Sequence, residues 1–279
     1  MVSDRSPMKR ALLLPFLLIA AALAGHAQPG TATLKRQLQA RLAFLDTFSF
    51  YEDRDVDVDA YSVKTMRLLV RYLSRVQPTA RELKQFRNFE RSARYDDSLQ
   101  LRAYYFGYSS GGTRGQYTHT VLQWRSPDGQ LHAHDLSPLL YCEFHAIYPL
   151  RSATGRYYLL LGSESGNAST VQRIALVVRI DSNKLDARVP VFSRWSSINL
   201  PNAGYTYYPR SGVLRCDLSD REGHDVPDPP GILRRSDSSG VRALRQLFAR
   251  QWDDPVCLRF NGSRFVRTRC PKAPAGSGL

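Results

Sequence analysis

The spacing of apolar residues changes near Ser98, and this change constrains the fold more than any other feature of the chain. Upstream of it, leucines recur at helical spacing from Leu34 to Leu45, and a second periodic segment covers 62–74. Thr79 and the glutamate three residues later form a capping-box pattern, which predicts the start of a third helix. The side chains expected on the buried faces of the last two helices are Val63, Met66, Val70, Leu73, Leu83, Phe86 and Phe89. We therefore expect residues 28–97 to form a helical N-terminal segment.

Downstream of Ser98 the chain reads as strands, because segments rich in β-branched and aromatic residues alternate with turn signals. The connections are short, which favours antiparallel hairpins over parallel units. Asn261 and Gly262 predict a two-residue turn in a terminal hairpin. The sequence thus predicts an α+β protein, in which amphipathic helices pack on a mainly antiparallel β body over 98–272. This body is sandwich-like or a meander, with a further helix over 241–252.

The N-terminus has the pattern of a secretory signal peptide. Residues 12–24 are almost entirely apolar and follow Lys9 and Arg10. The apolar stretch is shorter than the roughly 20 residues that a membrane-spanning helix needs. We expect residues 1–27 to be a signal peptide cleaved after Ala27. The mature protein is then exported to the periplasm or the extracellular space, is not a transmembrane protein, and ends in a disordered tail over 273–279.

The chain is basic, with 39 Lys and Arg against 25 Asp and Glu, a formal charge of +14. A phosphate-rich partner would explain such an excess, and so would a general preference for Arg over Lys. Past the N-terminus the arginines are dispersed from Arg36 to Arg269, whereas nucleic-acid binders concentrate their charge on an arm or a helix face. We therefore exclude a nucleic-acid partner and expect at most attraction to an anionic envelope surface, glycan or peptide.

Four cysteines in an exported chain are candidates for disulfide bonds: Cys142, Cys216, Cys257 and Cys270. Cys257 and Cys270 flank the predicted terminal hairpin, although a two-residue turn would place Val266 opposite Cys257. A bond between Cys142 and Cys216 would use the remaining pair. The alternative is that the thiols are buried and free.

Four aspartates alternate in sequence before the second helix: Asp53, Asp55, Asp57 and Asp59. A calcium-binding EF-hand loop starting at the second of them would need Gly and Glu where the chain has Ala60 and Met66. Negative charge is also favourable at a helix N-terminus without any metal. The preferred interpretation is a helix lead-in.

Two histidines, His132 and His134, lie on one face of a predicted strand, and Cys142, Glu143 and His145 follow in sequence. A metal site could be assembled from these residues, but nothing in the spacing fixes a third ligand. Histidines on a solvated strand face explain the same pattern. We therefore assign no metal, cofactor or catalytic residue from the sequence.

Tyrosines cluster in three strands, and exposed aromatic rings beside Arg could stack on sugars or peptides. Tyr104, Tyr158 and Tyr207 represent this candidate aromatic binding face. Because the faces of a strand alternate, part of any such set must also face the core, so core packing is the preferred interpretation of these clusters.

Two motifs of the β-rich part carry a family resemblance. The first is Gly111, Gly112 and Thr113 after a predicted strand, with Phe106 where the family pattern has Trp. The second is the run Tyr157–Leu160. Together they resemble a family of exported bacterial proteins of unknown function. The resemblance implies an exported protein with leading helices and a β-rich body, and it carries no catalytic residues.

The resulting functional hypothesis is an exported, non-enzymatic binding or envelope-interaction module with an aromatic and arginine-bearing sheet face. The alternative is a hydrolase acting on an envelope or extracellular polymer, with acids such as Glu143, Glu164 or Asp135.

Overall fold

The computed structural model describes residues 30–91, 101–109, 116–167, 170–201, 203–217 and 255–271. The predicted signal peptide, the predicted helix over 241–252 and the predicted tail over 273–279 lie outside these residues.

The leading part of the described chain is helical, as predicted. Its helices are α2 (Thr31–Thr47), α3 (Val58–Leu73) and the single turn α4 (Ala80–Leu83). The four periodic leucines of α2 are all buried. The capping box at Thr79 is present, but the helix ends at Leu83. Phe86 and Phe89 are buried, and they belong to the irregular segment that follows the helix. Within the described residues, no helix combines the length and the hydropathy needed to cross a membrane.

The predicted buried face of α3 is partly wrong. Met66 and Leu73 are buried, but Val63 is 45% exposed, and Leu69 and Tyr72 take the central positions instead. Apolar residues occur on more than one side of this helix, so the periodicity alone permits more than one orientation. Packing on the sheet selects the face that carries Met66, Leu69, Tyr72 and Leu73.

The β body contains three antiparallel sheets in the described residues, which confirms the α+β prediction. Their strands are β1 (Glu90–Arg91), β2 (Leu101–Ser109), β3 (Gln116–Arg125), β4 (Leu131–Asp135), β5 (Glu143–Leu150), β6 (Arg156–Asn167), β7 (Thr170–Asp181), β8 (Lys184–Asp186), β9 (Ser197–Pro201), β10 (Gly204–Tyr208), β11 (Val213–Asp217), β12 (Val256–Phe260) and β13 (Phe265–Thr268). The first sheet has the order β1-β2-β3-β4, the second β5-β6-β7-β8 with β9 also paired to β7, and the third β10-β11-β12-β13.

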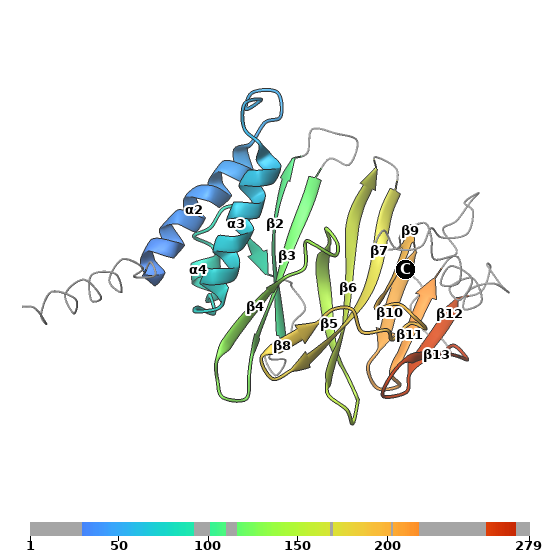
Figure 1. The fold of residues 1–279 in the computed structure, drawn as a ribbon. Helices are drawn as coiled ribbons and strands as arrows, with labels where there is room; N and C mark the ends of the chain where they lie inside the picture. The colour runs from blue at the N-terminus through green and yellow to red at the C-terminus, as the bar shows by residue number, and fades with distance from the viewer. Residues whose placement is uncertain are drawn as a thin grey trace, which may run out of the picture.

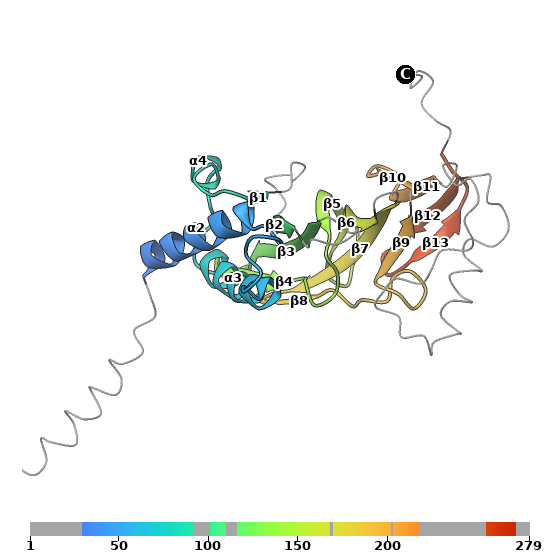
Figure 2. The same ribbon diagram turned by 90° about the horizontal axis from the view of Figure 1, so that it is seen from above.

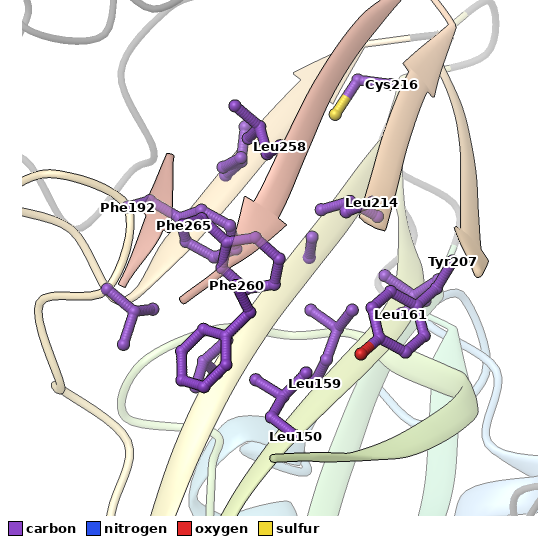
Figure 3. Close-up of a cluster of buried hydrophobic side chains, with 14 of the residues drawn as sticks. Leu150, Leu159, Leu161, Phe192, Tyr207, Leu214, Cys216, Leu258, Phe260 and Phe265 are labelled. Carbon is purple, nitrogen blue, oxygen red and sulfur yellow. The ribbon is translucent and has the colours of Figure 1, made fainter. Parts of the chain in front are cut away.

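The helices and the three sheets form successive layers (Figures 1 and 2). One apolar cluster joins α2 and α3 to the even-numbered face of β2, including Phe106. A second joins the other face of the first sheet, through Leu122, to Leu160 and Leu176 of the second sheet. A third cluster, drawn in Figure 3, joins the second sheet to Leu258 of the third. Each sheet thus contributes to at least one apolar interface between layers.

The central strands β6 and β7 are buried on both faces over their apolar runs. Leu159 and Leu161 face the third sheet, whereas Leu160 between them faces the first. A strand covered on both sides reads as a continuous apolar run rather than an alternation, which explains the sequence YYLLL.

The terminal hairpin of β12 and β13 is confirmed, but its predicted two-residue turn is wrong. Phe260 pairs with Phe265, so four residues form the loop, and the Asn261 side chain accepts hydrogen bonds from two backbone amides inside it. This longer loop places Thr268 opposite Cys257 and brings Cys270 within bonding distance. Cys257 and Cys270 form a disulfide with a Cα–Cα distance of 5.1 Å.

The buried side chain of Gln123 on β3 joins the helical layer to the first sheet. Its Nε2 donates to the carbonyl oxygens of Leu73 (2.6 Å) and Val76 (2.8 Å), at the C-terminal end of α3. Its Oε1 accepts a hydrogen bond from the hydroxyl of Tyr104 (3.1 Å). The last carbonyls of a helix have no partner within the helix, and here one amide satisfies two carbonyls around that end. Gln123 therefore fixes where α3 ends over the sheet.

We predict that Gln123→Leu lowers the free energy of unfolding by about 3 kcal/mol, because two carbonyls and the Tyr104 hydroxyl lose their buried partner. Urea denaturation measures this loss. Gln116→Leu is the matched control, since it makes the same chemical change at an exposed position of the same strand, and it should change stability by less than about 0.5 kcal/mol. Equal effects of the two substitutions would contradict this account of Gln123.

Candidate functional site

A groove of about 670 Å³ runs beside β4, the outermost strand of the first sheet. It is larger than two other hollows, of about 450 and 420 Å³, that described residues line elsewhere. One wall is the last part of α3 and the residues after it, from Val70 to Arg75, and the opposite wall is the turn and strand start Asn183–Leu185. Leu131–His134 of β4 lie between the walls, with Trp124. We call this hollow the β4 groove.

The β4 groove is basic. Arg71 and Arg75 are exposed on the helix wall, and Lys184 is exposed on the opposite wall. None of the described residues that line the groove carries a carboxylate; Asp135, the next residue of β4, lies outside the lining. Cations that converge on a concave surface without acids between them raise the local concentration of anions.

A hydrogen bond from Trp124 attaches the β7–β8 turn, which forms the groove wall opposite the helix, to β3. Its indole Nε1 donates to the carbonyl oxygen of Ser182 (3.1 Å), within the turn between β7 and β8. The imidazole of His132 stacks on the indole with a centroid distance of 5.3 Å, and its Nε2 lies 2.9 Å from the Ser126 hydroxyl. The two groove walls are therefore attached to β3 by neighbouring residues, Gln123 and Trp124, which face opposite sides of the sheet.

The two histidines of β4 share one face of the strand, as predicted. His132 pairs with Trp124 and His134 with Leu122, and these two β3 residues both face the second sheet. Burial lowers the pKa of His134, which the nearby Asp135 carboxylate opposes. At neutral pH His134 is therefore mainly uncharged, and Arg71, Arg75 and Lys184 supply positive charge to the groove.

The residues proposed as companions of these histidines lie elsewhere. His145 is the extra residue of a β-bulge in β5 and lines a separate hollow with Arg173 and Tyr205. Cys142 is fully buried, and burial raises the pKa of its thiol well above the ordinary value. Within the described residues, no three His, Cys, Asp or Glu side chains lie together in an arrangement that could hold a metal ion.

Three of the four alternating aspartates accept hydrogen bonds from backbone amides or from a tyrosine hydroxyl. Asp57 caps α3 by accepting a hydrogen bond from the amide of Ala60 (2.9 Å), and Asp53 accepts one from the amide of Ser49 (3.0 Å). Asp59 accepts a hydrogen bond from the Tyr108 hydroxyl (2.6 Å). The helix lead-in interpretation is confirmed for Asp57, which is the N-cap of α3, and for Asp59, which lies in its first turn.

The predicted aromatic binding face is wrong. Tyr104 is 0% exposed, Tyr158 6% and Tyr207 7%, and each belongs to a different one of the three apolar clusters. Figure 3 shows Tyr207 pointing toward Leu161 of the second sheet. The strands β2 and β6 are covered on both faces, and Tyr207 lies on the face of β10 that packs on the second sheet, so the three tyrosines fill the core.

The prediction for Cys142 and Cys216 as a disulfide is also wrong. Both are buried free thiols, and they lie in separate clusters on opposite sides of the second sheet. The stacked sheets keep their side chains apart.

The acids proposed for a hydrolase lie on three different strands, and none of them lines the β4 groove. Asp135 accepts a hydrogen bond from the amide of Ser137 (2.8 Å) at the end of β4. Glu143 lies on β5, where its charge contributes to the raised pKa of Tyr105 after the larger effect of burial. Glu164 pairs with Gln172 across β6 and β7.

The sequence did not identify the cations of the groove. Arg71 belongs to α3 and Arg75 follows its end, whereas Lys184 lies more than 100 residues further along the chain. The dispersed arginines gave no local signal, because the site exists only once the helix and the β7–β8 turn reach either side of β4.

Comparison of the chain with protein-family models, curated proteins and solved structures gives no match.

His119, on β3, is a buried polar residue beneath the helices. Its ring stacks on Phe106 with a centroid distance of 5.0 Å, and its Nδ1 lies 2.8 Å from the Ser137 hydroxyl. Burial lowers its pKa to about 4, although the carboxylates of Asp135 and Asp59 oppose the shift. His119 is therefore neutral in the folded protein at neutral pH.

We predict that His119 makes stability fall between pH 6.5 and about 4. In that range the unfolded chain binds a proton on this histidine and the folded chain does not, so lowering the pH favours unfolding by up to about 3 kcal/mol. Above pH 6.5 the contribution is constant. The difference in unfolding free energy between wild type and His119→Phe, measured across this range, isolates the effect. A pH-independent difference would contradict it.

Proposed function

We propose that the protein is an exported binding module that receives an anionic, carboxylate-bearing ligand in the β4 groove. The observation that carries the proposal is the convergence of Arg71, Arg75 and Lys184 on one concave surface with no carboxylate among the described lining residues. Arg and Lys are the side chains that recognise carboxylates, Arg through its planar fork and Lys as a point charge.

The shape of the groove supports binding rather than catalysis. Its lining includes three basic side chains and no carboxylate, and the acids considered for hydrolysis lie outside the lining on three different strands. The groove also has an apolar surface beside the cations, formed by Val70, Leu131, Ala133 and Leu185. This mixture of apolar walls and a few charged groups is typical of ligand sites.

Export is part of the proposal. The predicted signal peptide motivates it, and the Cys257–Cys270 disulfide is compatible with it, because such bonds persist in oxidising compartments. The resemblance to exported bacterial proteins of unknown function also points to this location and stays a prediction. An envelope polymer or peptide is then the kind of anion that the protein would meet.

We predict that Arg71→Glu with Lys184→Glu weakens binding of polyglutamate and of polygalacturonate by about tenfold or more at low salt, because two attractions become repulsions. Titration calorimetry measures the affinity, and raising the salt concentration should weaken the wild-type interaction.

Arg259→Glu with Arg267→Glu is the matched control. It makes the same change in net charge at exposed positions on β12 and β13, in the third sheet. Equal weakening by the two double variants would mean that net charge, and not the groove, governs binding, and the proposed function would be rejected.

A further inference from the structure

We infer that the β4 groove binds an acidic peptide in an extended conformation, which pairs with the open edge of β4 as an added strand. This inference rests on the proposed function and goes beyond it, because it names a peptide backbone as the recognised group.

The outward-facing backbone groups of β4 follow from its hydrogen bonds with β3. The Leu136 amide donates to the carbonyl oxygen of Thr120, and the Ser126 amide donates to that of Gln130 (both 2.9 Å). With the continuous register between the strands, the even-numbered residues of β4 point their amides and carbonyls at β3. The amides and carbonyls of Leu131, Ala133 and Asp135 therefore point away from β3.

No described strand pairs with this edge, since β4 is the last strand of its sheet. Among the described residues, no backbone–backbone hydrogen bond reaches the outward groups of Leu131, Ala133 or Asp135. A row of unpaired amides and carbonyls is a template for another strand, and peptide recognition by strand addition uses this feature.

The groove follows this edge. Four consecutive residues of β4, Leu131–His134, line it, and they span most of the five-residue strand. A ligand that occupies the groove therefore lies alongside the unpaired backbone rather than across it.

The cations are placed for a strand whose side chains alternate. Arg71 and Arg75 lie on the wall formed by the helix, to which Ala133 also faces. Lys184 lies on the other wall, on the side of His132 and His134. Successive side chains of an added strand point to opposite walls, so neighbouring acidic residues would each meet a cation. A peptide with consecutive Asp or Glu residues fits this charge pattern.

The first test removes one outward-facing donor. Ala133→Pro deletes an amide hydrogen that β3 does not use, and proline is tolerated at such edge positions. We expect it to weaken binding of the labelled peptide Glu-Glu-Val-Glu-Glu-Val-Glu-Glu by about fivefold, the value of one backbone hydrogen bond. Ala133→Ser, which changes the side chain but keeps the amide, should weaken binding less than Ala133→Pro does. Fluorescence anisotropy measures both affinities, and a thermal melt checks folding.

The second test leaves the protein unchanged and needs no variant to fold. The same peptide is N-methylated at alternate residues in two versions, which share all side chains and charges. Strand addition predicts that one version binds about fivefold or more weakly than the other, because only one set of amides faces β4. Equal binding of the two versions would overturn the inference.

The outcomes separate this inference from the proposed function. If N-methylation has equal effects in both versions but Arg71→Glu with Lys184→Glu still abolishes binding, the groove is an anion site without strand addition. A polygalacturonate oligomer that binds more tightly than the peptide would assign the groove to a glycan and overturn the peptide inference. If the charge variants leave all probes unaffected, both proposals fail.

Discussion

Two neighbouring side chains of β3 determine the arrangement on which the rest depends. Gln123 satisfies carbonyls at the end of α3, and Trp124 donates to the turn after β7 from the opposite face of the strand. Since adjacent residues of a strand point to opposite sides, one short segment can hold elements of two layers. The helix end and the turn are the walls of the β4 groove, so its geometry follows directly from these hydrogen bonds.

The stacked sheets explain why the aromatic residues are structural here. The central sheet is covered on both faces, so tyrosines at successive positions all enter the core, and Tyr157 and Tyr158 are both buried. The proposed binding site lies instead at an edge of the layers, where a described strand lacks a neighbour. The outer edge of β4 is such a place, and cations from two other elements surround it.

The sequence predicted features that depend on local spacing. The leucine pattern of α2, the capping box at Thr79, the antiparallel strands and the terminal disulfide all depend on residues that are close in the chain. The face of α3 was less predictable, because its apolar residues permit several orientations and the sheet selects one. The alternation of strand faces favoured core packing for the tyrosine clusters, but the apolar cluster that Tyr104, Tyr158 and Tyr207 each join could not be predicted, since it depends on which sheet covers which. For the same reason the groove could not be predicted from the sequence, because its cations come from segments that are distant in the chain.

The central claim is that β4 presents an unpaired edge on which an acidic peptide adds a strand. Residue-resolved amide hydrogen exchange, with and without the glutamate-rich octapeptide, tests it most directly. The account predicts that the amides of Leu131, Ala133 and Asp135 exchange fast in the free protein and slow down on binding, while those of His132 and His134 are already protected by β3. Binding of the peptide without added protection at the three outward amides would contradict the claim.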